Sequence, residues 1–311
     1  ISANMKLEYQ FHRWLADRTR QNNDDDTGVF LSIGDDAAVV SSRGRKQVLT
    51  TDSLAEGIHF LTSEHSLERI GHKSMAASLS DLAAMGARPE FGLVSFFLPT
   101  EFDLAQTQQL FVAMEETAEL YGVSIVGGDT NCWEQGLVIH VTLIGSLKDS
   151  QLAWVKSGAT PGDRILVTGE FGGSLDGKHL DFEPRVKMAN HLRDHYPVKA
   201  ATDVTDSLSL DLASMADASN VTLQIDAGRI PLSNSIADFE EFTAIHHALV
   251  DGEDFELILS VSPSVAEQIL KDPSIDVPVT EIGVVIPKGT DSILLDQNGT
   301  VSPFQPQGYI H

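Results

Sequence analysis

IGDDAAVV at residues 33–40 and LTTDSLAEGIHF at residues 49–60 each join a short apolar run to small residues and aspartates. This pattern predicts a strand that gives way to a loop, the usual location of ligand-binding side chains. Asp35 and Asp36 lie at the first predicted strand end, and Asp52 lies at the second. The two motifs therefore predict an acidic site built where strands end.

The same pattern returns as VSIVGGDTN at residues 123–131 and AATDVTDSLSLDL at residues 200–212. These recurrences add four aspartates: Asp129, Asp203, Asp206 and Asp211. Two ionised carboxylates about 4 Å apart repel by roughly 4 kcal/mol at an effective dielectric of about 20, so a convergent set needs protons or cations. The cation that most often neutralises such a set of carboxylates is magnesium, bound together with a phosphorylated substrate. Any single aspartate is better explained as a cap of a surface turn or helix, but the recurrence favours a shared site.

The composition is that of a globular protein with two domains. The chain has 311 residues, of which 42% are hydrophobic and 21% are charged, and this length suits two cores of ordinary size. The formal net charge of −24 argues against a nucleic-acid partner, because no basic surface is available to meet the phosphate backbone. A phosphate ligand would have to be approached through metal ions or backbone amides.

Cysteine content and hydropathy give expectations about the compartment. The single cysteine, Cys132, excludes an internal disulfide and fits a reducing, cytoplasmic location. No apolar run reaches the length of a membrane-spanning helix. Lys6, Glu8 and Arg13 make the first residues unlike a secretory signal. We therefore expect no membrane partner.

The spacing of apolar and turn-forming residues predicts an arm and two domains. Residues 6–20 are amphipathic and predict a helix, within an arm spanning residues 1–26. The polar segment KSGATPGDR begins at Lys156 and is punctuated by glycine and proline, which marks the best domain boundary. We therefore expect domains at residues 27–155 and 156–311. Because strands and helices mix with hairpin-like neighbours, we expect an α+β fold.

Three elements of the first domain can be predicted in detail. A helix is expected over residues 67–85, with Ser66 as its cap. FGLVSFFL at residues 91–98 predicts a buried strand because the run is mostly apolar. Thr100 and Asp103 are expected to form a capping pair for the next helix.

One motif resembles a phosphate-binding P-loop and is rejected. Gly172 is followed by four residues and then by Gly177 and Lys178, but His179 stands where a P-loop has Ser or Thr. An imidazole is a poor ligand for magnesium. The glycines are better explained by a tight turn between a strand and a helix.

Taken in order, the motifs resemble the aminoimidazole ribonucleotide synthetase (PurM-like) superfamily, and within it the thiamine-monophosphate kinase family. The resemblance rests on IGDDAAVV, TTDSLAEGIHF, HKSMAASLSDLAAMGARPE, IVGGDT, SGATPGD, VTG followed by Gly173-Ser174, DVTDSLSLDL, DGEDFEL and the closing GYIH. It implies a two-domain PurM-like fold in a homodimer. The N-terminal domain would form half of an intersubunit β-barrel, and the C-terminal domain would be α/β.

The resemblance also implies a reaction and a set of site residues. The γ-phosphate of ATP would pass directly to thiamine monophosphate, with several magnesium ions; whether potassium assists is left open. The implied magnesium ligands are Asp36, Thr50, Thr51, Asp52, Asp81, Asp129, Asp203 and Asp206. The implied ATP contacts are Gly128, Asp129, Lys156 and Thr205. The implied thiamine contacts are His59, Glu253 and Tyr309. No residue is implied as a general base.

Three departures from the family pattern leave alternatives open. Ser207 stands where the family has glycine, and it would either strain the backbone or begin a helix. Lys156 replaces an arginine, and residues 131–136 replace a shorter loop after Thr130. The alternatives are another ATP-dependent member of the superfamily, such as a ribonucleotide cyclo-ligase or a hydrogenase-maturation enzyme, and a degenerate protein that binds ATP or metal without kinase activity.

Overall fold

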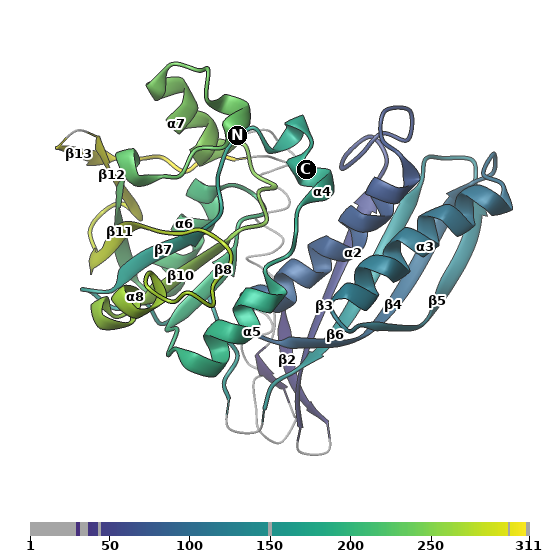
Figure 1. Ribbon diagram of the computed structural model, residues 1–311, viewed down its shortest axis with the longest axis horizontal. Coiled ribbons are helices and arrows are strands. Elements are labelled where there is room, and N and C mark those ends of the chain that lie inside the picture. Colours follow the sequence, from purple (N-terminus) through teal and green to yellow (C-terminus); the bar gives the residue numbers. More distant parts are fainter. Residues whose placement is uncertain (1–28, 32–36, 43–44, 149–150, 298, 309–311) are drawn as a thin grey trace. The chain divides into compact units, whose positions relative to one another are not determined.

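The computed structural model describes residues 29–31, 37–42, 45–148, 151–297 and 299–308. The described residues form two compact units. Unit 1 takes the chain up to Ala153 together with Leu180–Val186, and unit 2 takes Trp154–His179 and the chain from Lys187 onward. Each unit contains one β-sheet with helices beside it (Figure 1), which confirms the predicted α+β fold of two domains. The predicted helix at residues 6–20 lies outside the described residues.

Unit 1 has a six-stranded sheet in the order β1-β2-β3-β6-β4-β5. Its strands are β1 (Val29–Leu31), β2 (Ala38–Ser42), β3 (Arg45–Ala55), β4 (Arg88–Pro99), β5 (Ser124–Trp133) and β6 (Val138–Ser146). The pair β4–β5 is parallel and the other neighbours are antiparallel. Helices α2 (Leu67–Ala84) and α3 (Leu104–Leu120) lie side by side along this sheet (Figure 1).

Helix α2 confirms the helix predicted over residues 67–85. The Ser66 side chain caps its start by accepting a hydrogen bond from the Arg69 amide at 3.5 Å. The helix ends at Met85, and Gly86 follows with φ 61°, the left-handed conformation that stops a helix. Its apolar face is completely buried, with Ile70 and Leu79 at 0% exposure.

Two other predictions for unit 1 need correction. The strand at residues 91–98 is not buried on both faces, because Phe91, Leu93 and Phe97 are 44%, 41% and 44% exposed. These three side chains lie on the face of the sheet that the helices leave open. The cap of α3 is made by Asp103 and Gln106 in a reciprocal capping box, and not by Thr100 with Asp103, because the helix begins at Leu104 and Asp103 is therefore its N-cap.

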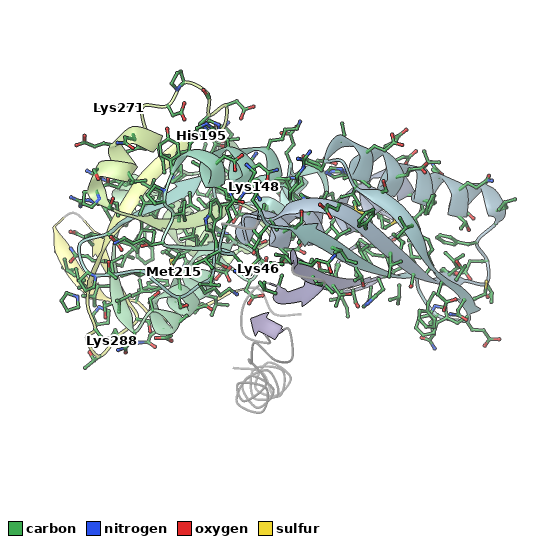
Figure 2. All side chains as sticks on the ribbon, turned by 90° about the horizontal axis from the view of Figure 1, so that it is seen from below. Lys46, Lys148, His195, Met215, Lys271 and Lys288 are labelled. Carbon is green, nitrogen blue, oxygen red and sulfur yellow. The ribbon has the colours of Figure 1, made fainter. Side chains whose placement is uncertain are left out.

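Unit 2 has a seven-stranded sheet in the order β13-β12-β9-β11-β7-β10-β8. The strands are β7 (Arg164–Thr168), β8 (Ala200–Asp203), β9 (Val221–Asp226), β10 (Leu257–Val261), β11 (Val279–Pro287), β12 (Ile293–Gln297) and β13 (Thr300–Pro303). The helices wholly within this unit are α6 (Leu208–Ala218), α7 (Glu241–Val250) and α8 (Pro263–Ile269), with short 3-10 turns at Ser174–Asp176, Ala227–Arg229 and Asn234–Ile236. Helix α4 (Lys178–Asp181) begins in this unit and ends in unit 1, and α5 (Val186–His195) lies in this unit except for its first residue. Met215 of α6 lies in the core of this unit (Figure 2). Among the described residues, no helix is long and apolar enough to cross a membrane.

Candidate active site

Unit 1 gathers three of the predicted metal ligands between β3 and α2. Asp81 of α2 accepts a hydrogen bond from the Thr50 hydroxyl, and Asp52 accepts one from Ser78 of α2 at 2.6 Å. Burial raises the pKa of Asp52 from its ordinary value, and the Ser78 hydrogen bond opposes this rise. Because desolvation disfavours the ionised form, a nearby cation would favour the carboxylate here.

Thr51 lies on the opposite face of the sheet from Thr50 and Asp52, because side chains alternate along a strand. Its hydroxyl lies 2.9 Å from His140 Nε2 and 2.8 Å from the Thr142 hydroxyl. Ser53, two residues along the same face, lies 2.5 Å from His140 Nδ1. Within unit 1, the side chain of Thr51 is therefore separated from the pair Asp52 and Asp81 by the sheet itself.

Gly128 and Asp129 lie on β5, at the edge of the sheet. Asp129 is exposed and accepts a hydrogen bond from the Asn131 side chain at 2.8 Å. Two strands lie between β5 and β3, a separation of about 14 Å across the sheet. Within the sheet of one chain, Asp129 therefore does not lie next to Asp52.

His59 lies in the loop after β3 and is held in place by two neighbours. Its Nδ1 accepts a hydrogen bond from the Ala55 amide at 3.0 Å, so the neutral ring carries its proton on Nε2. Its carbonyl accepts a hydrogen bond from Lys73 of α2 at 2.9 Å. Lys73 is only 1% exposed. Lys73 is not among the site residues that the sequence predicted, although a lone lysine in the small-residue helix HKSMAASLSDLAA was a visible signal.

Unit 2 brings together four predicted site residues from two loops. Loop 203–207 follows β8 and loop 251–256 precedes β10, and these two strands are antiparallel partners. The pairing continues into the loops, since the Glu253 amide donates to the Thr205 carbonyl at 2.7 Å and the Phe255 amide donates to the Val204 carbonyl at 2.9 Å. The four residues are the metal positions Asp203 and Asp206, the ATP position Thr205 and the thiamine position Glu253.

The four residues differ in their exposure. Asp206 is exposed and Thr205 is partly exposed, whereas Asp203 and Glu253 are both 3% exposed. Gly252 explains how closely the loops approach, because a Cβ atom there would lie 2.4 Å from the Asp206 carbonyl oxygen.

Ser207 begins a helix without strain. Its φ is 173°, which is extended backbone, and its hydroxyl accepts a hydrogen bond from the Leu210 amide at 3.0 Å as the cap of α6. Asp211, one turn into the helix, accepts from the amides of Thr205 and Ser207. The second of the two possibilities for Ser207 is therefore the observed one. Lys156 is partly exposed, and its carbonyl accepts from the Ser219 hydroxyl at 3.2 Å.

Lys178 does not occupy the position of a P-loop lysine. Its ammonium group lies 3.4 Å from Asp254 Oδ1 and 3.2 Å from Glu256 Oε1, two carboxylates that are each 1% exposed. Burial raises the pKa of Asp254 to about 7; Lys178 opposes this shift, and the Glu256 charge adds to it. The sequence motifs did not predict this cluster, although the acids of DGEDFEL were a visible signal.

We expect replacement of Asp254 by Asn to change the pH dependence of stability. The pKa of Asp254 is about 7 in the folded chain against an ordinary 3.8, so from about pH 4 to about pH 7 the folded chain holds a proton that the unfolded chain has released. Stability therefore falls as pH rises through this range. The difference in melting temperature, Asp254→Asn minus wild type, should therefore be more positive at pH 8 than at pH 5. A difference that is the same at both pH values would contradict this.

The metal positions do not form a complete ion site within the part of the chain that the structure describes. There, no group of three or more His, Cys, Asp or Glu side chains is arranged to hold a metal ion. Two further predicted residues, Asp36 and Tyr309, lie outside the described residues. The donors that are present are carboxylates and hydroxyls, which suit hard divalent cations such as magnesium.

Comparison with known proteins places the chain in a family. The family model described as "AIR synthase related protein, N-terminal domain" matches residues 34–147, and its C-terminal counterpart matches residues 177–296. The thiamine-monophosphate kinase of Rhodopirellula baltica is 38% identical over 319 residues, covering 98% of this chain and 97% of that protein.

Two solved structures extend the comparison. "AaThiL complexed with AMPPCP and TMP" is 26% identical, with a TM-score of 0.79 and 94% of each chain covered. A HypE–HypF complex is 22% identical, with a TM-score of 0.72 over 87% of this chain and 93% of that one, and it shows the fold alone. The chain belongs to the AIR synthase related (PurM-like) family, and within it to the thiamine-monophosphate kinases.

Proposed function

We propose that this chain transfers the γ-phosphate of ATP directly to thiamine monophosphate, giving thiamine diphosphate. The observation that carries the proposal is the similarity to thiamine-monophosphate kinases over almost the whole chain. The related AaThiL structure contains AMPPCP and TMP. Its 26% identity to this chain supports the same pair of ligands here.

The proposed chemistry fits the donors that the structure holds. Donor and acceptor are both phosphates, so two anions must meet in a protein whose net charge is already −24. Magnesium ions, when bound, would neutralise this charge. The residues proposed to hold them are Asp36, Thr50, Thr51, Asp52, Asp81, Asp129, Asp203 and Asp206. Potassium forms no part of the proposal.

The chain's own residues would then bind and orient the two substrates. We assign the nucleotide to Gly128, Asp129, Lys156 and Thr205, and the thiamine end to His59, Glu253 and Tyr309. The hydrogen bond from the Ala55 amide to His59 Nδ1 fixes the orientation of this ring. No general base is needed, because the acceptor phosphate is already ionised near neutral pH.

A homodimer is part of the proposal. The open face of the unit 1 sheet exposes Phe91, Leu93 and Phe97, and β5 is an edge strand of that sheet. Exposed apolar faces and unpaired strand edges are features that association removes. We propose that a second copy covers this face, as expected for an intersubunit β-barrel. The cytoplasm is the proposed compartment, since both substrates would be available there.

One assay tests the proposed reaction. Purified protein is incubated with magnesium, ATP and thiamine monophosphate, and both ADP and thiamine diphosphate are measured. Equal amounts of the two products are expected, with none formed after chelation of magnesium. The acceptors of the related cyclo-ligase and hydrogenase-maturation enzymes are tested in parallel. Turnover of one of those, with none of thiamine monophosphate, would refute the proposal.

A further inference from the structure

Three charged side chains form a mostly buried cluster at one end of the unit 2 sheet. The Lys178 ammonium group is 3.4 Å from Asp254 and 3.2 Å from Glu256. The two carboxylates are 1% exposed, and the lysine side chain is 26% exposed. Burying charges costs several kcal/mol per ion unless they are well paired. Replacing a buried charge cluster by apolar residues is often neutral or stabilising, so net stabilisation of the fold is a weak explanation for this cluster.

The cluster joins three segments of unit 2 that are distant in sequence. Glu256 Oε2 accepts a hydrogen bond from the Thr168 hydroxyl of β7 at 2.6 Å. Lys178 donates to the Glu170 carbonyl at 2.5 Å. Gly169 is packed against the same carboxylate, since a Cβ there would lie 2.1 Å from Glu256 Oε1. The glycine turn that resembled a P-loop thus directs its lysine inward onto the DGEDFEL loop.

The backbone on both sides of Asp254 is strained. Glu253 and Phe255 each have φ 51°, a left-handed conformation that costs a residue with a side chain about 1–2 kcal/mol. Such residues persist only where their surroundings hold them, and they concentrate at functional sites. The amides of both residues are bound by the loop that carries Thr205.

We propose that Lys178, Asp254 and Glu256 are positioning residues for the acceptor substrate. They hold Glu253 and Phe255 in the left-handed conformation on either side of Asp254, and this fixes Glu253 where it can contact the thiamine end. The inference rests on the proposed function, because it takes thiamine monophosphate as the acceptor and Glu253 as its contact. It adds residues that act through the loop and do not touch substrate.

The test compares Asp254→Asn and Lys178→Met with Lys271→Met. Lys271 is a matched control, since it is 77% exposed, pairs only loosely with Glu267 at 3.8 Å and lies at the outer edge of unit 2 (Figure 2). For each protein, kcat and the KM values for ATP and thiamine monophosphate are measured. The Kd of thiamine monophosphate is measured by calorimetry with AMPPCP present, which gives a readout without turnover.

The expected result is selective for the acceptor. Asp254→Asn should raise both KM and Kd for thiamine monophosphate about tenfold, while the KM for ATP stays within about twofold. Lys178→Met should do the same or more, and Lys271→Met should match the wild type. Asp254→Asn keeps the shape of the side chain and is expected to fold, so it decides the matter even where Lys178→Met does not fold.

Two outcomes would overturn the inference. Unchanged KM and Kd for thiamine monophosphate in Asp254→Asn would overturn it while leaving the proposed function intact. So would equal losses for ATP and thiamine monophosphate, because they indicate a general structural defect. If the wild type neither binds nor turns over thiamine monophosphate, the proposed function fails, and the positioning role fails with it.

Discussion

Asp81→Asn is expected to lower the rate of thiamine diphosphate formation at least ~100-fold, which corresponds to about 2.7 kcal/mol of lost transition-state stabilisation. Asp81 accepts a hydrogen bond from Thr50, and Ser78 of the same helix donates to Asp52, so the three predicted ligands lie between β3 and α2. An amide keeps the shape and one acceptor oxygen but removes the negative charge that holds a cation. The loss should be partly offset by raising the magnesium concentration.

The fold should survive this change. Removing one of two neighbouring carboxylate charges relieves repulsion, so the melting temperature of Asp81→Asn should not fall. Glu116→Gln is the control, because it removes the same charge from an exposed position on α3 of the same unit. Steady-state kinetics at limiting and saturating magnesium check the prediction. Near-normal turnover of Asp81→Asn at limiting magnesium would remove this residue from the proposed metal site.

The sequence predicted the elements whose signals are local. Ser66, Gly86 and the apolar spacing between them define α2 almost to the residue, because caps and periodicity act within one or two turns. The same holds for Ser207, whose serine side chain caps α6 where glycine was expected. The α+β class followed from the order of such elements.

The faces of the sheet were harder to predict. FGLVSFFL is mostly apolar and predicts a buried strand, yet Phe91, Leu93 and Phe97 are exposed in one chain. Periodicity reports how apolar a residue is, and it does not report what covers the residue. For the same reason, adjacent residues of one motif were grouped although alternation places Thr51 on the opposite face from Asp52.

The ion pairs of unit 2 could not be predicted from spacing. Lys178 and Asp254 are 76 residues apart, and only the strand order β7-β10-β8 brings the segments that carry them together. Lys73 is similar, because its target is the His59 carbonyl, a backbone atom that leaves no trace in side-chain chemistry. These contacts depend on the topology of the fold, whereas a sequence motif carries information only about residues that are close together in the chain.

Among the glycines of unit 1 that the structure describes, Gly128 is the one where an added methyl group is expected to lower stability most. Gly128 of β5 is the register partner of Val94 of β4, and a Cβ atom at Gly128 would lie 1.6 Å from the Val94 carbonyl oxygen. That atom belongs to the backbone, so it moves only if the two strands separate. We expect a loss of about 3 kcal/mol or more, which lowers the melting temperature by at least about 6 °C.

Gly127→Ala isolates this effect, because it adds the same methyl group one residue earlier. A Cβ at Gly127 would meet only Leu93 Cδ2, at 3.4 Å, an ordinary van der Waals contact that a side chain can adjust. Its melting temperature should stay within about 2 °C of the wild type.

Addition of magnesium and AMPPCP should raise the melting temperature of the wild type and of Gly127→Ala through ligand linkage. The same addition should leave that of Gly128→Ala unchanged, because the proposed nucleotide contact lies on the strand that has moved. Equal melting temperatures for the two variants would mean that β5 does not approach β4 this closely, and the assignment of Gly128 and Asp129 to the nucleotide would lose its structural basis.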